Sequence, residues 1–385
     1  MLKPKVLIFI AYFYPGYKAG GALRSSINLV NLIARDRDVY VVTSDRDVGD
    51  KFPYSDVRAN HWMAVGESQV LYLKVSPLSV LYLFRHLRSC DFDVIYLNSF
   101  FNFHFSIVPL LFRFIGLLKG SKCVLGPRGE FDPAALAVGR LKKISYLFIV
   151  KVLGLHKGLV WHASTQLELD HIKKVFVDSS TISEVIPDPL FFREKVGSVN
   201  AVLKDGSGTF RIIFLSRIHP NKNLLFLLDA LSRIRQLNIV LNIYGPIEDD
   251  MYWSSCLKLL KGLSHNMTVR YRGTLRYDEV CLAFEGHHLF CFPTLCENFG
   301  HVIFESLSVG TPVLLSDKTP WTASAIRSKG GLVVRGLDSN AWAHCIESWA
   351  AMDVDEYMSR RVAARDLYDS LAAPSMLGRY LSLLR

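Results

Sequence analysis

Short runs of consecutive apolar residues alternate along this chain with longer segments in which apolar residues recur every three or four positions. Continuous runs such as residues 6–10 and 289–292 are typical of strands covered on both faces of a parallel sheet. Helical periodicity follows most of these runs, for example over residues 22–34 and 224–234. The pattern therefore predicts an α/β protein built from strand–helix–strand units.

The alternation is interrupted once, over residues 193–209, where a polar, glycine-bearing stretch has no clear period. At 385 residues the chain is also too long for one ordinary core. We therefore expect two Rossmann-like, doubly wound parallel-sheet domains, at residues 1–192 and 210–365, joined by the linker 193–209. The last segment, 366–385, is expected to be a helix that returns to the first domain. The ligand cleft is expected between the carboxyl ends of the two sheets.

Composition adds a charge bias to this picture. The formal net charge is +10, and residues 1–190 contain 23 Lys and Arg against 16 Asp and Glu, or +7. A basic half favours an anionic surface or substrate. Nucleic acid is not the expected partner, because no helix-turn-helix, RNP or zinc-finger spacing is present.

Cysteine usage and the N-terminus indicate a cytoplasmic protein. The seven cysteines are scattered without a CxxC pair, which favours buried free thiols in a reducing compartment. The N-terminal apolar run is short, lacks a small-residue cleavage site and leads into a glycine turn. It is interpreted as the first buried strand and not as a signal peptide.

One basic segment has two interpretations. Residues 133–167 contain no acid and carry lysines and an arginine among aliphatic and aromatic residues. An amphipathic helix of this kind can lie on anionic lipid. It can equally be an ordinary surface helix with solvated lysines, and the sequence does not decide between the two.

The richest chemistry lies in residues 292–310, FPTLCENFGHVIFESLSVG. A strand ends at Pro293, Glu297 follows in a loop, helical periodicity begins near Gly300, and Glu305 comes about two turns later. A helix N-terminus favours a phosphate, and carboxylates accept hydrogen bonds from hydroxyls. Together these features predict a sugar-nucleotide site.

A second phosphate-binding candidate is the loop 12–21, which ends in Gly20 and Gly21. It lies between the first strand and the first helix, but it is not a GxGxxG fingerprint, which argues against a dinucleotide. Paired glycines let backbone amides approach a phosphate, and a plain turn is the alternative.

Four segments in the C-terminal half resemble the retaining glycosyltransferases of family 4, also called group 1, which adopt the GT-B fold. They are SRIHPNKNL (216–224), IYGP (243–246), YRGTL (271–275) and PTLCENFGHVIFESLSVGTPVLLSD (293–317). In the N-terminal half, YPGYKAGG (14–21) looks like the family's glycine loop. The resemblance covers most of the chain and is strongest over residues 211–320.

The resemblance implies roles for individual residues. Arg217 and Lys222 would bind the donor diphosphate and neutralise charge on the leaving group, so that no metal is required. Glu305 would bond the ribose hydroxyls and Glu297 would lie against the transferred sugar, which makes Arg217, Lys222 and Glu297 the expected catalytic residues. The implied donor-binding residues are Gly20, Gly21, Arg217, Lys222, Gly245, Gly273, Thr274, Glu297, Asn298, Phe299, Gly300 and Glu305.

The chain departs from the family pattern at two places. Where many members carry a histidine near the transferred sugar, residues 126–130 read GPRGE. Arg128 and Glu130 are therefore candidates for binding the acceptor, and Arg128 could bind the donor instead. His104 and His162 are alternative histidines, each favoured as structural. The second departure is IPDPL at 186–190, where Pro189 replaces a glycine.

The function implied by the resemblance is retaining transfer of a hexosyl or N-acetylhexosaminyl group from a nucleotide sugar, UDP- or GDP-linked. The acceptor would be a hydroxyl of a lipid-linked saccharide or an oligosaccharide in the synthesis of O-antigen, capsule or exopolysaccharide. No cofactor or metal is expected, and the enzyme would lie at the inner face of the plasma membrane. A GT-B nucleotide-sugar epimerase and a non-catalytic sugar-nucleotide-binding protein are the alternatives.

Overall fold

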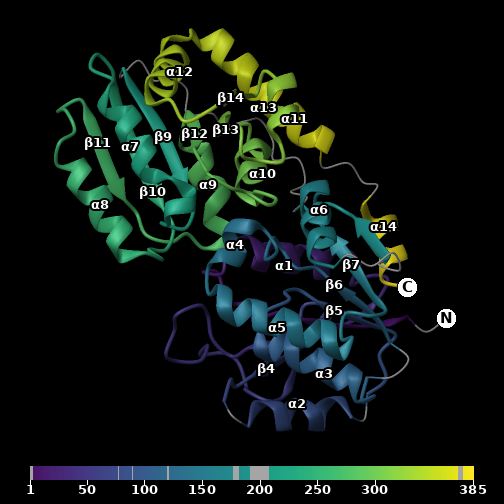
Figure 1. Ribbon diagram of the computed structural model, residues 1–385. Coiled ribbons are helices and arrows are strands. Elements are labelled where there is room, and N and C mark those ends of the chain that lie inside the picture. Colours follow the sequence, from purple (N-terminus) through teal and green to yellow (C-terminus); the bar gives the residue numbers. More distant parts are fainter. Residues whose placement is uncertain are drawn as a thin grey trace. The chain divides into compact units, whose positions relative to one another are not determined.

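The computed structural model describes residues 3–76, 78–88, 90–118, 121–176, 182–190, 208–371 and 376–385 (Figure 1). The chain forms two compact units, which we call unit 1 (residues 1–189 with 374–385) and unit 2 (residues 190–373). The expected linker, 193–209, lies outside the described residues except for its last two positions.

Unit 1 is built on an eight-stranded sheet in the order β3-β4-β2-β1-β5-β6-β7-β8. Neighbouring strands are parallel except for β3, which pairs antiparallel with β4 at the edge of the sheet. The sequence pattern did not predict β3. The strands are β1 (Lys5–Phe9), β2 (Asp38–Ser44), β3 (Trp62–Val65), β4 (Ser68–Leu73), β5 (Val94–Leu97), β6 (Lys122–Leu125), β7 (Leu159–Ala163) and β8 (Ile182–Val185).

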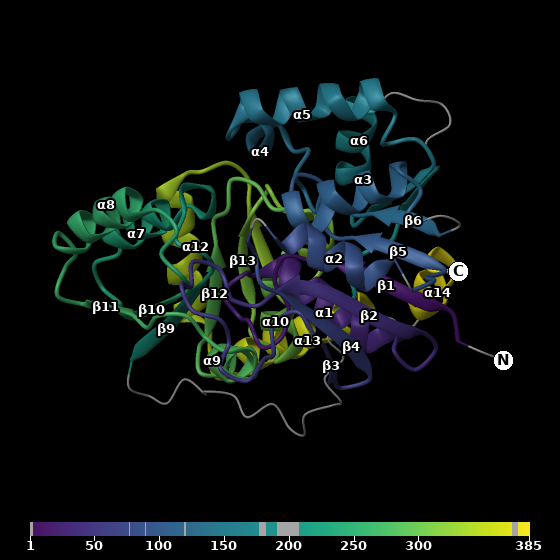
Figure 2. The same cartoon turned by 90° about the horizontal axis from the view of Figure 1, so that it is seen from below.

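Helices cover both faces of this sheet. One face packs against α1 (Gly21–Ile33) and α14 (Met376–Leu383), and the other against the remaining helices of unit 1 (Figures 1 and 2). The apolar segment 101–118 contains a π-helical turn, η1, followed by α3. The elements on this second face are α2 (Ser79–Leu87), η1 (Phe103–Ile107), α3 (Val108–Phe114), α4 (Pro133–Ala137), α5 (Arg140–Leu153) and α6 (Gln166–Val175).

The segment 366–385 spans two elements in different units. Its first part completes α13 (Val354–Leu371) in unit 2, and its second part is α14 in unit 1. In α14, Tyr380 is buried in the core beside α1, and its hydroxyl donates to the carbonyl of Pro187 at 2.9 Å. No helix of the described ranges is long and apolar enough to cross a membrane.

Unit 2 has a six-stranded, all-parallel sheet in the order β11-β10-β9-β12-β13-β14. Its strands are β9 (Thr209–Leu215), β10 (Asn238–Tyr244), β11 (Met267–Tyr271), β12 (Leu289–Phe292), β13 (Val313–Ser316) and β14 (Gly331–Val334). One face packs against α7 (Leu224–Ser232), α8 (Asp250–Leu260) and α12 (Ser339–Ala351), and the other against α9 (Val280–Glu285), α10 (His301–Ser308), α11 (Thr322–Arg327) and α13. The prediction of two doubly wound parallel-sheet units is confirmed.

Candidate functional site

Two of the predicted site residues meet at the carboxyl end of the sheet in unit 2. Lys222 ends the short 3₁₀ turn η2 (Pro220–Lys222) after β9, and Glu297 lies in the loop after β12. Because β9 and β12 are neighbouring parallel strands, their loops leave the same edge of the sheet. Lys222 Nζ lies 2.7 Å from Glu297 Oε2, and the two side chains are only 12% and 15% exposed.

Backbone contacts hold the two loops together around this pair. The hydroxyl of Thr294 donates to the carbonyl of Asn221 at 3.0 Å, and the N–H of Leu295 donates to the same oxygen at 2.8 Å. The N–H of Glu297 donates to the carbonyl of Lys318 at 3.2 Å. Hydrogen bonds to the main chain therefore fix both loops that carry the ion pair, and the position of the pair does not depend on flexible side chains alone.

The Glu297 carboxyl is held in its charged form. Burial alone would raise its pKa, but the charge and hydrogen bond of Lys222, helped by the N–H of Phe299, lower the pKa below its ordinary value. A charged carboxylate accepts hydrogen bonds from hydroxyl groups, and the adjacent ammonium attracts an anion. The pair can thus face a ligand that carries both hydroxyls and a phosphate.

The N-terminus of α10 lies beside this pair because of a glycine. Gly300 caps the helix with a φ of 83°, a left-handed conformation, and a Cβ there would lie 3.1 Å from Glu297 Cγ. Phe299 is buried against Phe304, and its carbonyl accepts the indole N–H of Trp321. The turn 297–300 is therefore fixed by packing, as a site that positions a ligand requires.

Arg217 forms an ion pair of its own, with Glu248. Its Nη1 lies 2.8 Å and 2.7 Å from the two carboxylate oxygens of Glu248, and both side chains are nearly half exposed. An exposed ion pair of this kind contributes about 0–1 kcal/mol. An incoming diphosphate could therefore replace Glu248 at little cost, and the diphosphate role of Arg217 stays a prediction.

Gly245 has a steric explanation that the sequence did not provide. Gly245 has a φ of 130°, and a Cβ there would lie 1.9 Å from the carbonyl oxygen of Ser216. Its N–H donates to the carbonyl of Gly273 at 2.9 Å, next to Thr274. These contacts hold the loops after β9, β10 and β11 together at the same edge of the sheet as Lys222.

In unit 1, Gly20 and Gly21 form the start of α1. Gly20 is the N-cap with a φ of 66°, and the space where its Cβ would point is open. The preceding loop is held by Asp47, whose Oδ2 accepts the N–H groups of Tyr17 at 2.7 Å and Lys18 at 3.0 Å. The two glycines therefore leave the helix N-terminus uncovered by side chains of their own, which suits a phosphate.

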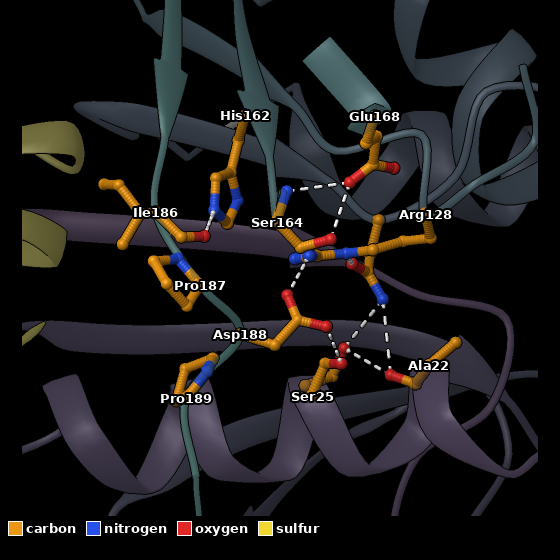
Figure 3. Close-up of polar contacts among 12 residues, drawn as sticks. Ala22, Ser25, Arg128, His162, Ser164, Glu168, Ile186, Pro187, Asp188 and Pro189 are labelled. Carbon is orange, nitrogen blue, oxygen red and sulfur yellow. Dashed lines mark hydrogen bonds and ion pairs between the residues drawn. The ribbon is translucent and has the colours of Figure 1, made fainter. Parts of the chain in front are cut away.

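Arg128 lies in a buried network of Ser25, Tyr96, Asn98, Arg128 and Asp188, which we call the Arg128 cluster. Figure 3 shows three of its members, Ser25, Arg128 and Asp188. The Nε of Arg128 donates to Asn98 Oδ1 at 2.5 Å, Nη2 donates to the Tyr96 hydroxyl, and Nη1 pairs with Asp188. Asp188 also accepts from the hydroxyl of Ser25 at 2.6 Å. The side chains of the ion pair are 8% and 4% exposed.

The Arg128 cluster ties the chain after β8 to the carboxyl ends of β5 and β6. Burial opposes the charge on Arg128, but Asp188 outweighs it and raises the pKa of the guanidinium. Asn28 of α1 adds a bond from its Nδ2 to the carbonyl of Pro189 at 2.8 Å. Arg128 therefore has a positioning role within unit 1, and ligand binding by Arg128 stays a prediction. Sequence reasoning missed Ser25, Tyr96 and Asn98 altogether, and it read the segment around Asp188 only as an altered turn.

Two carboxylates support the turn that carries Arg128. Glu130 accepts from the Ser99 hydroxyl at 2.8 Å and from the N–H of Phe100 at 2.5 Å, while burial raises the pKa of its carboxyl. Glu168 accepts from the N–H of Gly129 at 2.6 Å. Within unit 1, Glu130 thus positions backbone, and its predicted contact with an acceptor stays a prediction.

His162 is a structural residue, as favoured from the sequence. Its ring nitrogens lie 2.6 Å from the Tyr96 hydroxyl and 2.8 Å from the carbonyl of Ile186, and the side chain is fully buried. Burial, with the nearby charge of Arg128, lowers the pKa of His162 to about 3. The ring is therefore neutral and bridges β5, β7 and the segment after β8.

In the part of the chain that the structure describes, no group of three or more His, Cys, Asp or Glu side chains is arranged to hold a metal ion.

Comparison with known protein families finds a match within unit 2. Residues 209–351 match the family described as glycosyl transferases group 1. The O-antigen chain mannosyltransferase B of Escherichia coli is 26% identical over 142 residues, which are 35% of this chain and 36% of that protein. The chain thus spans about a third of the length of the curated relatives it matches.

Similarity to solved structures extends over the whole chain. Sucrose-phosphate synthase from Thermosynechococcus elongatus has a TM-score of 0.76 at 17% identity, over 100% of this chain and 98% of that one. Anabaena HepE in complex with UDP-glucose has a TM-score of 0.73 at 16% identity, over 99% of both chains. At these identities the likeness establishes the fold. The chain has the GT-B fold, and its residues 209–351 form a group 1 glycosyltransferase domain.

Proposed function

We propose that this protein is a glycosyltransferase that moves a sugar from a nucleotide-sugar donor, UDP- or GDP-linked, to a hydroxyl of a saccharide acceptor. The observation that carries the proposal is the buried Lys222–Glu297 pair beside the N-terminus of α10, inside a group 1 glycosyltransferase domain. It combines a cation for the diphosphate with a carboxylate for sugar hydroxyls. Arg217, which is exposed and follows the same strand β9 as Lys222, is the second cation.

The chemistry proposed is transfer with retention at the anomeric carbon, the mode implied by the resemblance to family 4. The bond from the anomeric carbon to the donor phosphate breaks, the acceptor oxygen bonds to the same face, and the departing phosphate oxygen takes the acceptor's proton. Such a reaction depends on positioning and on stabilising the leaving group more than on a strong protein base. Lys222 would neutralise the charge that grows on the diphosphate, and Glu305 would hold the ribose.

The acceptor is proposed to be a lipid-linked saccharide or an oligosaccharide in cell-surface polysaccharide synthesis, presented at the inner face of the plasma membrane. Two findings support this assignment. The similar protein from Escherichia coli is an O-antigen chain mannosyltransferase, and the basic charge is concentrated in the first half of the chain. The structure of HepE with UDP-glucose supports a uridine donor. No metal or cofactor is part of the proposal.

The test begins with thermal melting of the protein against UDP-, GDP-, ADP- and dTDP-sugars. A donor present at 100 times its Kd stabilises the folded state by about 2.7 kcal/mol. Lys222→Ala is expected to weaken or abolish turnover, while Lys258→Ala, at an exposed lysine of α8 in the same unit, is the matched control and should leave it unchanged. Stabilisation by none of these donors would refute the proposal.

Product analysis then separates the classes of activity. A transferase releases nucleoside diphosphate only when an acceptor is present, and NMR of the product should show the anomeric configuration of the donor. An epimerase would change the sugar without an acceptor. Binding without either reaction would indicate a sugar-nucleotide-binding protein.

A further inference from the structure

Helix α5 presents apolar side chains away from the body of unit 1. Of its fourteen residues only Val150 is fully buried, with Tyr146 and Leu147 partly buried against the core. In Figure 2 the helix lies at the margin of unit 1, with one long side facing away from the sheet. The exposed large apolar residues of the helix are Leu141, Ile144, Phe148, Ile149, Val152 and Leu153.

Helical geometry shows that these residues form a stripe. At about 100° per residue, Leu141, Phe148 and Val152 lie within about 40° of one another, on the side opposite Val150. They are 83%, 67% and 66% exposed. A surface helix of a water-soluble domain normally has its apolar stripe toward the core. In α5 the orientation is reversed, so packing within unit 1 does not explain the stripe.

The charges around the stripe are all positive. Arg140 and Lys151 border one side of it and Lys142 the other, and all three are exposed. Lys143 is turned inward, where its Nζ donates to the carbonyl of Ala135 at 2.7 Å. No acid occurs between residues 133 and 167. Exposed cations beside an apolar stripe can reach lipid phosphates while the apolar side chains enter the layer beneath them.

We propose that α5 docks unit 1 on an anionic lipid surface, with the stripe at the boundary of the acyl chains and the cations at the headgroups. The helix is about 21 Å long, so it would lie in the plane of the surface. A second copy of the chain is a poorer occupant, because two such faces would bring cations against cations with no acid between them. This inference deepens the proposed function by naming the partner of unit 1. It rests on the proposed function in one respect only: a lipid-linked acceptor explains why the protein would bind a membrane.

The test measures co-sedimentation of the full-length protein with vesicles of phosphatidylcholine alone or with about one third phosphatidylglycerol. We expect binding to the anionic vesicles that weakens with salt. The triple variant L141Q/F148Q/V152Q removes the stripe without changing charge, and glutamine is a good helix former, so the fold should persist. We expect its affinity for anionic vesicles to fall by about tenfold or more.

The charge variant K142Q/K151Q should also bind anionic vesicles about tenfold more weakly and with a smaller salt dependence. Its matched control is K258Q/K261Q, which removes two exposed lysines at the end of α8 in unit 2 and should bind as the wild type does. Equal losses for the two double variants would mean that net charge alone is responsible, and would overturn the proposal.

Two other results would also overturn it: a wild-type protein that binds neither vesicle, or a triple variant that binds as well as the wild type. A dimer that the triple variant converts to a monomer, without vesicle binding, would assign the stripe to a second copy. Donor binding by the same variants is measured in parallel by titration with UDP and GDP. Loss of vesicle binding in the variants, with intact binding of UDP or GDP, supports the inference. A wild-type protein that binds vesicles but neither nucleotide would refute the proposed function and leave the inference standing.

Discussion

The buried ion pair of the Arg128 cluster gives the sharpest test of the structure. Asp188→Asn keeps the size of the side chain and its contact with Ser25, but it removes the charge that balances Arg128. Arg128→Met removes the cation and fills part of its volume with an apolar chain. The double variant removes both charges together.

The expected magnitudes follow from burial. With exposures of 8% and 4%, each single change leaves an uncompensated charge away from water, which typically destabilises a protein by about 3–5 kcal/mol. The double variant leaves no such charge, so its loss should be smaller than the sum of the two single losses by about 2–3 kcal/mol. In a unit of roughly 200 residues, each single change should lower Tm by about 6–20 °C.

Differential scanning calorimetry measures these losses, since the transition of unit 1 can be followed separately where the two units melt at different temperatures. Arg233→Met is the matched control: this arginine pairs with Asp229 at the surface of unit 2, with both side chains more than 40% exposed. Its loss should be about 0–1 kcal/mol. The buried pair does not stabilise the segment after β8 if the double variant loses as much unfolding free energy as the two single variants together. The same conclusion follows if Asp188→Asn lowers Tm no more than the control does.

Four further predictions concern unit 2. Glu305→Ala should weaken donor binding roughly 10- to 100-fold in isothermal titration, because the ribose would lose a charged acceptor; unchanged affinity contradicts the assigned role. Lys222→Ala should lower kcat about 100-fold, with a smaller effect on donor affinity, since its charge matters most as the phosphate leaves; equal losses contradict this. Lys222→Met removes the main cause that lowers the pKa of Glu297, so the effect of burial should raise that pKa. The variant's loss of unfolding free energy should therefore be greatest at neutral pH and should shrink as the pH falls from the raised pKa of the variant to the lowered pKa of the wild type; a loss independent of pH would refute the linkage. Gly245→Ala should destabilise unit 2 by at least about 2 kcal/mol in denaturant unfolding, because a Cβ would overlap a backbone oxygen 1.9 Å away, whereas Gly262→Ala, where the nearest atom is 3.6 Å away, should be tolerated.

The strands were predictable because parallel strands covered on both faces must be continuously apolar. The apolar run 289–292 agrees with β12 at both ends. The edge strand β3 was missed although Trp62–Val65 is apolar throughout, because it is partly exposed and is defined by its antiparallel pairing with β4, which no local pattern shows. Helix α12 was missed as well, although Asp338 accepts bonds from the N–H groups of Asn340 and Ala341 as an N-cap. Local patterns thus specify an element best when both of its faces are buried.

The site was predictable only where local sequence carries it. Glu297, Gly300 and Glu305 lie within nine consecutive residues, and their spacing alone indicated a loop, a helix start and a second carboxylate. The contact between Lys222 and Glu297 joins residues that are 75 positions apart. The family resemblance assigned both residues to the donor site but did not predict their contact. The bond between Arg217 and Glu248 had no signal at all, because one surface acid among several cannot be singled out by composition.

The two departures from the family pattern are one feature in three dimensions. Arg128 stands where many members carry a histidine, and Asp188 lies in the altered turn 186–190, 60 positions later. From the sequence they were two separate departures: Arg128 was assigned to ligand binding, and the segment 186–190 was noted only for an altered turn. In the structure they neutralise each other in a site almost closed to water. A buried arginine without an anion, or a buried aspartate without a cation, would be strongly destabilising, so each of the two charges depends on the other. A relative with arginine after β6 should therefore also carry an acid in the segment after β8, and a histidine introduced at 128 should be tolerated better together with Asp188→Asn than beside the original aspartate.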